Sequence, residues 1–485
     1  MKLLTTLPAF RQDIADVMRL FLGDVKITDD PGEEGLVHES FDADGWHDRV
    51  TFRGVTRDFA WEKGGKGELE EKRLRKRAAK LAVYSVLKEA LGFRPPWGSL
   101  TGIRPTRLFY EALAQGMTED EAERFMAEEY DVSESKASLL RDIVRMQKGV
   151  HETGEGEFDL YIGIPFGATR CAYCSFSSGE IGDGRLVEPY IASLLREIKL
   201  TRALMEEANL KIRAAYMGGG TPTAISESQL SRILDAAQAA FPGAVEWTVE
   251  AGRPDTIDRG KLSAMREHGI TRISVNPQTF SDETLRAIGR AHTAEDTVRA
   301  FELARSEGFN HINMDIIAAL PGETQADFDR TLSKVISMDP ESVTVHALAI
   351  KHSSKLHESL HVSGKGHTQI SAEGADHMIS GARERLMAGG WRPYYLYRQK
   401  YMAGNLENVG YAKPGHACLY NIGNMEETAC VLALGAGSIS KWLFRDRDLR
   451  LERAPNVKNI EEYTRRVDEM VARTRRLILG EGEQA

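Results

Sequence analysis

The feature that most constrains the fold is a strand, turn and helix repeat between residues 151 and about 350. Short apolar runs rich in β-branched residues alternate there with amphipathic helical segments, a pattern typical of a parallel α/β sheet. Ser226 with Gln229, Thr293 and Thr324 are N-cap signals for three of the intervening helices. The expected strands are 158–164, 212–217, 245–250, 272–276, 311–317 and 342–350.

Polar motifs follow or end most of these expected strands. Gly218 and Gly219 begin a glycine turn after the second strand, and glycine lets backbone approach a ligand closely. Glu250 ends the third strand, and Asp315 interrupts the apolar fifth strand, where a carboxylate is costly unless it is paired or bound. Because the carboxyl ends of parallel strands meet at one edge, these residues predict a single site.

The loop after the first strand carries a C-x-x-C pair, Cys171 and Cys174. Such a pair alone is compatible with a redox dithiol, half of a zinc site or chance. Three thiolates in one loop would leave one iron of a [4Fe-4S] cluster open to an outside ligand. The position four residues before Cys171 is Gly167, so this loop offers two thiolates.

The order of the motifs carries a family resemblance. The loop 161–176, the GGGTPT turn, a strand-end glutamate and the segments 278–290 and 313–324 follow one another with few departures. Together they resemble the radical S-adenosylmethionine (SAM) enzymes of oxygen-independent coproporphyrinogen III oxidation and their heme-chaperone relatives. Segments 97–106, 394–400 and 405–416 resemble the subfamily with an extra N-terminal domain. The resemblance covers nearly the whole chain.

The resemblance implies an architecture of three parts. It is an α/β fold with an N-terminal α/β accessory domain over 1–150, a partial (β/α)6 radical SAM barrel over 151–350 and a C-terminal α+β region over 351–485 that covers the substrate. In its N-terminal part, the helical pattern over 68–91 carries a basic run from Lys72 to Lys80, which we interpret as a solvated helix face.

The resemblance also assigns roles to individual residues. Cys171 and Cys174 match the second and third ligands of a [4Fe-4S] cluster. The residues that match the SAM site are Tyr173, Gly218, Gly219, Glu250, Gln278, Arg290 and Asp315. The predicted catalytic residues are Tyr161, Arg398 and Lys400, and the candidates for holding substrate propionates are Arg170, Lys351, Arg398 and Lys400.

The implied activity is SAM-dependent oxidative decarboxylation of coproporphyrinogen III to protoporphyrinogen IX in heme biosynthesis, with an electron donor as partner. Three departures stand against the family pattern: Gly167 replaces the first cluster cysteine, Ala168 the usual proline, and Ala319 a usual glycine. The missing cysteine predicts an incomplete or labile cluster and impaired activity. A heme- or porphyrin-binding protein without turnover is the alternative. Cys418 is expected to be a packing residue, and neither Cys418 nor Cys430 is an obvious replacement for the missing ligand.

Composition excludes several other classes. The formal net charge of −9 disfavours a nucleic-acid partner. Four cysteines in 485 residues do not make a disulfide scaffold, so a reducing cytoplasm is the expected location. No apolar run reaches the length of a membrane span. We therefore expect a cytoplasmic protein, and its local basic clusters remain compatible with a small anionic ligand.

Overall fold

A computed structural model of the chain describes residues 1–23, 27–28, 30, 33–65, 67–102, 104–173, 179–349, 371–399, 405–445 and 450–480. The chain divides into two compact units. The first comprises Met1–Arg141 with Arg398–Glu407, and the second comprises Asp142–Tyr397 with Asn408–Ala485. The sequence placed its boundaries near residues 150 and 350. Most of the segment after 350 lies in the same unit as the strand and helix repeat.

The first unit is a four-stranded sheet packed against helices. The sheet order is β1 (Lys2–Thr5), β2 (Gly35–Asp42), β3 (Trp46–Phe52) and β4 (Val55–Trp61), with β1 parallel to β2 and the other pairs antiparallel. Leucine, valine and phenylalanine side chains from the sheet and from two helices form one buried core. The helices of this unit are α1 (Arg11–Leu22), α2 (Glu68–Leu91), α3 (Pro105–Ala114), α4 (Glu119–Tyr130) and most of α5 (Glu134–Gln147), with the short η1 (Pro8–Phe10) before α1.

Helix α2 has the predicted bounds, but its basic run is not uniformly solvated. Arg75 is buried and donates to both carboxylate oxygens of Asp48 on β3, at 2.7 and 2.9 Å. Lys80 donates to Thr101 Oγ1, and burial lowers the pKa of Lys80 to about 8. The interpretation of the whole run as a wet face is therefore wrong for Arg75, because a buried carboxylate on the sheet recruits it.

The second unit is organised by one long sheet whose central strands are all parallel. In chain order these are β5 (Glu157–Ile164), β8 (Lys211–Gly219), β9 (Glu246–Gly252), β10 (Arg272–Val275), β11 (Ile312–Ala318) and β12 (Ser342–Ala347), and each pairs with the next. All six strands expected from the sequence are present at nearly the expected bounds. This topology confirms the predicted α/β class.

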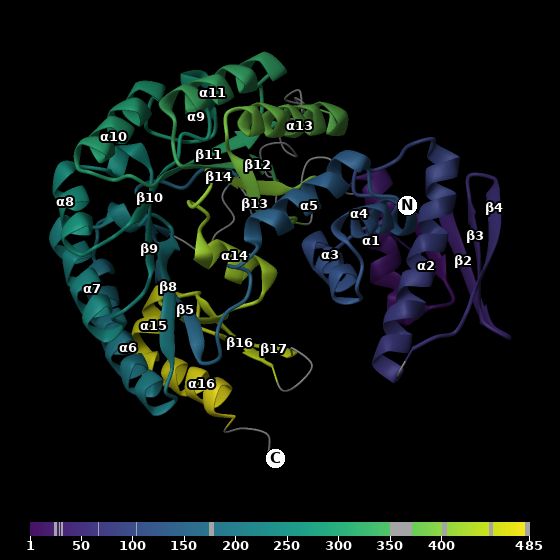
Figure 1. Cartoon of the computed structure of the whole chain (residues 1–485), viewed down its shortest axis with the longest axis horizontal. Coiled ribbons are helices and arrows are strands. Elements are labelled where there is room, and N and C mark those ends of the chain that lie inside the picture. The colour runs from purple at the N-terminus through teal and green to yellow at the C-terminus, as the bar shows by residue number, and fades with distance from the viewer. Residues whose placement is uncertain are drawn as a thin grey trace. The chain divides into compact units, whose positions relative to one another are not determined.

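Helices connect these parallel strands and form an outer arc around them (Figure 1). Ser226, Thr293 and Thr324 each accept a hydrogen bond from the third residue of the helix that follows and complete capping boxes, as predicted. The connecting helices are α6 (Val187–Glu207), α7 (Glu227–Ala240), α8 (Arg259–Glu267), α9 (Asp282–Ala287), α10 (Ala294–Ser306) and α11 (Gln325–Met338), with short turns η2 (Pro222–Ala224) and η3 (Pro254–Thr256).

The C-terminal segment extends the same sheet at both edges. Beyond β12 lie β14 (Asn408–Ala412) and β13 (Arg392–Tyr397), and β15 (Cys430–Leu434) pairs in parallel with β5. The hairpin of β16 (Ile439–Phe444) and β17 (Arg450–Pro455) follows β15. The remaining elements are α13 (Ala372–Ala388), α14 (Leu419–Glu426), α15 (Ile460–Arg465), α16 (Val467–Leu479) and the small parallel pair β6 (Phe166–Gly167) and β7 (Gly179–Glu180).

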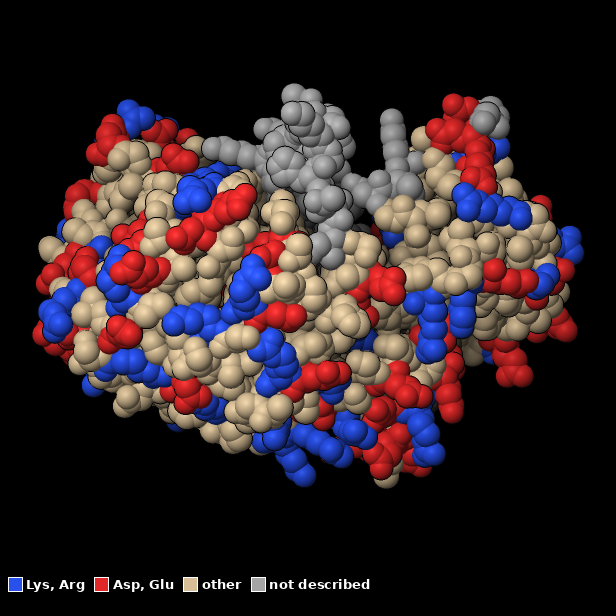
Figure 2. Space-filling view, turned by 90° about the horizontal axis from the view of Figure 1, so that it is seen from above, with Lys and Arg blue, Asp and Glu red and all other residues tan. Residues whose placement is uncertain are grey.

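Charge on the surface is mixed in sign. Figure 2 shows Lys and Arg interspersed with Asp and Glu over the face that it presents. Such a surface does not present the single-sign field that binds a polyanion. Across the described ranges, no helix combines the length and the apolar character that a bilayer span requires.

Candidate active site

The carboxyl ends of the parallel strands bring several predicted residues to one edge of the sheet. Gly219 ends β8, Glu250 lies near the end of β9, and Asp315 lies in β11. Gln278 follows β10 and forms a parallel bridge with Ile316 of β11, so its backbone is fixed beside Asp315. Gln278 has a φ of 65°, a left-handed conformation uncommon for a residue with a side chain. These positions form a candidate ligand site.

Glu250 is held by a phenol from the neighbouring strand. Tyr216 of β8 donates its hydroxyl to Glu250 Oε1. Gly218 lies against the same carboxylate, since a Cβ on Gly218 would come within 2.7 Å of Glu250 Oε2. A side chain at position 218 would therefore displace Glu250. The observed position of Glu250 therefore depends on a glycine at position 218.

Burial raises the pKa of Glu250 to about 7, and the negative charge of Asp315 adds to the rise. The hydrogen bond from Tyr216 opposes it. Near neutral pH this carboxyl group is therefore poised between its two protonation states. A cationic ligand at this point would favour the ionised form and would be bound by it.

Asp315 lies in the opposite electrostatic situation. Asn313 donates to Asp315 Oδ1 at 2.7 Å, and His346 Nε2 of β12 lies 3.7 Å from Asp315 Oδ2. Burial alone would raise the pKa of Asp315, but the hydrogen bond and charge of His346, with the bond from Asn313, hold it below its usual value. Asp315 is therefore an ionised acceptor at neutral pH, which suits ligand hydroxyl groups.

The glycine turn after β8 is packed directly against the backbone at the end of β5. Gly220 donates to Ile164 O at 2.8 Å, and Thr221 donates to Phe166 O at 2.7 Å. A Cβ on Gly220 would come within 2.4 Å of Phe166 O, and Gly219 has a φ of 113°. No larger residue fits without moving the backbone, so this turn has a fixed shape.

Three tyrosines from distant parts of the chain stack at the site. The rings of Tyr216 and Tyr420 lie 4.6 Å apart between centroids, and Tyr161 lies 6.4 Å from Tyr216 and 6.2 Å from Tyr420. Tyr161 comes from β5, Tyr216 from β8 and Tyr420 from α14. The stack joins the predicted residue Tyr161 to the Tyr216–Glu250 pair. It also ties the C-terminal segment to the site.

The loop that carries Cys171 follows β5 and contacts the turn after α9. Ala172 donates its N–H to Ile288 O at 2.9 Å, and Arg290 donates to the Tyr173 hydroxyl at 3.3 Å and to Asn276 O at 3.3 Å. The Cys171 thiol interacts with both Tyr173 and Arg290. The structure thus brings Cys171, Tyr173 and Arg290 together. Cys174 lies outside the described residues.

The donor set does not complete an iron-sulfur site in the part of the chain that the structure describes. Cys171 contributes one thiol there, and those residues contain no group of three potential metal ligands. Gly167 is buried on β6, and a Cβ at that position would meet its nearest neighbour, Thr169 O, at 3.4 Å, an ordinary contact. The backbone at position 167 therefore has room for a Cβ.

Both other cysteines are buried, and for Cys418 this agrees with the predicted packing role. Cys418 is buried before α14 and donates to Glu246 Oε1 at 3.2 Å, and burial raises the pKa of its thiol to about 12. Cys430 is buried in β15, where its sulfur accepts from Leu443 N at 3.4 Å. Neither environment favours the thiolate that an iron ligand requires.

Arg398, predicted to be catalytic, lies in the first unit. Its guanidinium is buried, donates to the backbone carbonyls of Leu100, Gly102 and Asn405 and stacks on the Trp97 ring. These contacts describe an internal role, and a role for Arg398 in holding propionate stays a prediction. Lys351 and Lys400 lie outside the described residues. Arg170 is partly buried in the cysteine loop.

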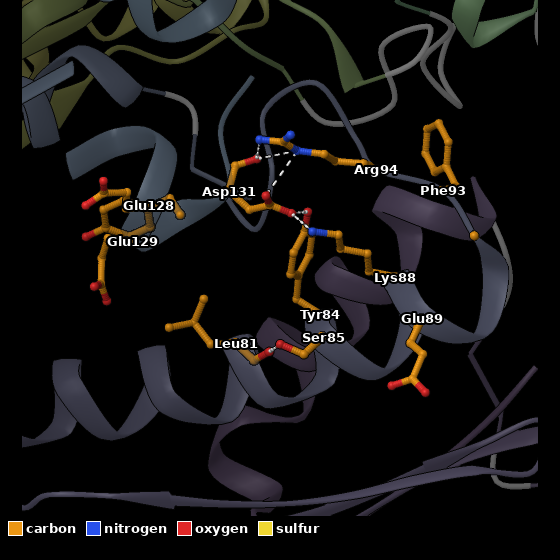
Figure 3. Close-up of a pocket in the computed structure, with 12 residues that line it drawn as sticks. Leu81, Tyr84, Ser85, Lys88, Glu89, Phe93, Arg94, Glu128, Glu129 and Asp131 are labelled. Carbon is orange, nitrogen blue, oxygen red and sulfur yellow. Dashed lines mark hydrogen bonds and ion pairs between the residues drawn. The ribbon is translucent and has the colours of Figure 1, made fainter. Parts of the chain in front are cut away.

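A cavity of about 740 Å³ lies in the first unit, between α2 and the turn after α4 (Figure 3). Tyr84, Lys88 and Arg94 all converge on Asp131, at 2.6, 2.6 and 3.0 Å. The two cations are thus already paired with a carboxylate. Among the described residues predicted for cofactor or substrate, none lines this cavity.

Several site residues were missed at the level of sequence. Tyr216 stands two positions before Gly218 in a strand, so strand alternation puts both on the same face. His346 is a polar residue in an apolar strand, the signal that singled out Asp315. Asn276 links Gly252, Asp315 and Arg290, and only the sheet order reveals this connection.

Comparisons with known proteins agree with this geometry. The Radical SAM superfamily profile matches residues 161–335. The oxygen-independent coproporphyrinogen-III oxidase-like protein HemZ of Bacillus subtilis (strain 168) is 38% identical over 394 residues, covering 79% of this chain and 77% of the relative. The heme chaperone HemW of the same organism is 35% identical over 194 residues, covering 39% of this chain and 50% of the relative.

A solved structure shows the same fold. Coproporphyrinogen III oxidase (HemN) from Escherichia coli, described as a radical SAM enzyme, matches with a TM-score of 0.53 at 22% identity and covers 69% of this chain and 73% of its own. The chain therefore belongs to the radical SAM superfamily, and within it to the oxygen-independent coproporphyrinogen III oxidase-like family that includes HemZ.

Proposed function

We propose that this chain binds SAM at the carboxyl edge of its barrel and serves heme biosynthesis in the cytoplasm. The tetrapyrrole substrate is coproporphyrinogen III, and the product of its oxidative decarboxylation is protoporphyrinogen IX. The observation that most supports the SAM site is the pair of carboxylates, Glu250 and Asp315, beside a glycine turn too tight for side chains. SAM carries an ammonium group and ribose hydroxyls that match these two acceptors.

Each carboxylate has an environment suited to one part of SAM. Glu250, fixed by Tyr216, accepts the ammonium group through a charge-assisted hydrogen bond. Asp315, held ionised by His346 and Asn313, accepts the ribose hydroxyls. Gly218 and Gly219 let the methionine end approach the backbone. Gln278, Arg290 and Tyr173 hold the rest of SAM, and Tyr161 is the catalytic tyrosine of this proposal.

The residues present do not fit a complete [4Fe-4S] cluster with one open iron. Such a cluster needs three thiolates, and the loop supplies Cys171 and Cys174 with Gly167 in the first position. When bound in a radical SAM site, the cluster supplies the single electron that cleaves SAM. Oxidative decarboxylation by this sequence therefore depends on a third iron ligand from outside the loop, and on an electron donor.

The same observation favours a second candidate function. A chain that keeps the SAM carboxylates but lacks a cluster thiolate could bind heme or porphyrin without turnover. A relative named as a heme chaperone matches 39% of this chain at 35% identity. Under this alternative the site would retain its tetrapyrrole partner and lose radical chemistry.

Anaerobic reconstitution with iron and sulfide separates the two functions. The enzyme proposal expects a labile, substoichiometric cluster in this chain that still gives slow reductive SAM cleavage and some protoporphyrinogen from coproporphyrinogen III. The binding-protein alternative expects substoichiometric iron, saturable binding of one heme per chain and no product. Calorimetric titration of the metal-free chain with SAM tests the SAM site by itself, with Glu250→Gln as the control. Absence of SAM binding would contradict both the site and the roles given above.

A further inference from the structure

Arg253 directly follows β9 and contacts the cysteine loop, which is distant from it in sequence. It is 4% exposed. Its Nη1 donates to the carbonyl oxygen of Thr169 at 3.1 Å and to Thr169 Oγ1 at 2.6 Å. Thr169 precedes Cys171 by two residues. A buried guanidinium thus grips the cysteine loop by its backbone and by a side chain.

The grip of Arg253 is itself braced. Arg253 Nε and Nη2 donate to the two carboxylate oxygens of Asp255, at 3.1 and 3.0 Å, in a bidentate pair. His292, 2% exposed, places Nδ1 3.7 Å from Asp255 Oδ1. The carboxylate fixes the plane of the guanidinium, so Nη1 can point only toward the loop. If Arg253 served only the local turn, its ion pair with Asp255 would be sufficient. The additional hydrogen bonds to Thr169 would then have no role.

Thr169 passes the constraint on to the other side of the loop. Its hydroxyl accepts from Arg253 and donates to Gly289 O at 3.3 Å, on the turn after α9. Ala172 donates to Ile288 O on the same turn. Gly289 has a φ of 76°, and a Cβ there would come within 3.9 Å of Cys171 Cα. The cysteine loop is therefore held on one side by Arg253, which follows β9, and on the other side by the turn after α9.

We propose that Arg253 is a positioning residue that holds the cysteine loop in place in the metal-free chain. It acts through Thr169 and fixes the position of Cys171 relative to Arg290 and Tyr173. The inference rests on the proposed role of Cys171 as an iron ligand.

We call the contact of Arg253 with Thr169 the clamp. Hydrogen–deuterium exchange of the full-length, metal-free chain tests it. Arg253→Gln is expected to speed amide exchange in residues 167–173 by about tenfold, with little change in the strands, because two charge-assisted hydrogen bonds are lost. Thr169→Val removes only the hydroxyl and should give a smaller increase. Thr169→Ser keeps the hydroxyl and should restore slow exchange. Arg196→Gln, which breaks an exposed bidentate pair with Asp468, is the matched control.

A second measurement separates this proposal from the proposed function. In the Gly167→Cys background, Arg253→Gln should slow iron uptake severalfold. Faster local exchange in Arg253→Gln supports the clamp, whether or not any variant assembles a cluster. Failure of every variant to assemble a cluster would reject only the iron site. Unchanged exchange in both Arg253→Gln and Thr169→Val, with normal iron uptake, overturns the clamp while leaving the iron site intact. Should Arg253→Gln fail to fold, Thr169→Val with its Thr169→Ser rescue decides.

Discussion

Removal of the Tyr216 hydroxyl should weaken SAM binding and shift its pH dependence. In Tyr216→Phe the ring keeps its stacking on Tyr420, whose centroid lies 4.6 Å away, and only the donor to Glu250 is lost. A hydrogen bond to a charged group is worth about 1.5–3 kcal/mol, so SAM affinity at neutral pH should fall by roughly tenfold or more.

The pH profile gives the more specific signature. SAM needs ionised Glu250, whose pKa is about 7, and an α-ammonium group, whose pKa is about 8. Affinity should therefore rise as pH increases through about 7 and fall again at higher pH. The Tyr216 bond lowers the pKa of Glu250, so Tyr216→Phe should move the acidic limb upward by about one pH unit. The alkaline limb belongs to SAM and should stay in place.

Calorimetric titration of the metal-free protein between pH 6 and 9 measures both effects, within the range set by these pKa values. Tyr420→Phe is the matched control, because its ring belongs to the same stack and no hydrogen bond from its hydroxyl to Glu250 occurs in the described structure. An unchanged affinity and an unchanged acidic limb in Tyr216→Phe would refute the role given to Glu250.

Three further perturbations test other parts of the site and its barrel. Asp315→Ala should weaken SAM binding by about tenfold even without iron, as judged by calorimetry, since the ribose hydroxyls lose an ionised acceptor; unchanged affinity rejects that role. Gly220→Ala should destabilise the chain by about 1–3 kcal/mol in urea unfolding, because its Cβ would lie 2.4 Å from Phe166 O; a neutral effect would show that the turn is not fixed. Burial lowers the pKa of His311 to about 2, so below pH 6.5 the unfolded chain binds a proton that the folded chain does not, and the free energy of unfolding falls by about 1.4 kcal/mol per pH unit. His311→Gln should reduce this pH dependence in thermal midpoints measured from pH 7.5 to 5. An unchanged slope would contradict this role of His311.

The parallel strands and helix starts could be predicted because their signals are local. Each central strand is a short apolar run, and the caps at Ser226, Thr293 and Thr324 need only residues three positions apart. The order in which the strands pair follows from short right-handed connections. This is why the fold class was accessible before any coordinates.

The contacts that shape the site depend on pairings distant in sequence. Tyr420 reaches Tyr216 because α14 lies against the sheet, and β15 pairs with β5 far from it along the chain. Nothing local to either segment predicts these neighbours. Arg75 was misread for the same reason, because its buried partner Asp48 lies on a different element. Tyr216 and His346 could have been found from strand alternation.

The most direct test of the account is restoration of the first cluster cysteine. A Cβ at position 167 meets only ordinary contacts, so Gly167→Cys should be accommodated by the fold. After anaerobic reconstitution, the variant should hold close to four irons per chain and cleave SAM when reduced, and the parent chain should do neither well. A parent chain that already holds a full cluster and cleaves SAM as fast as Gly167→Cys would contradict the account.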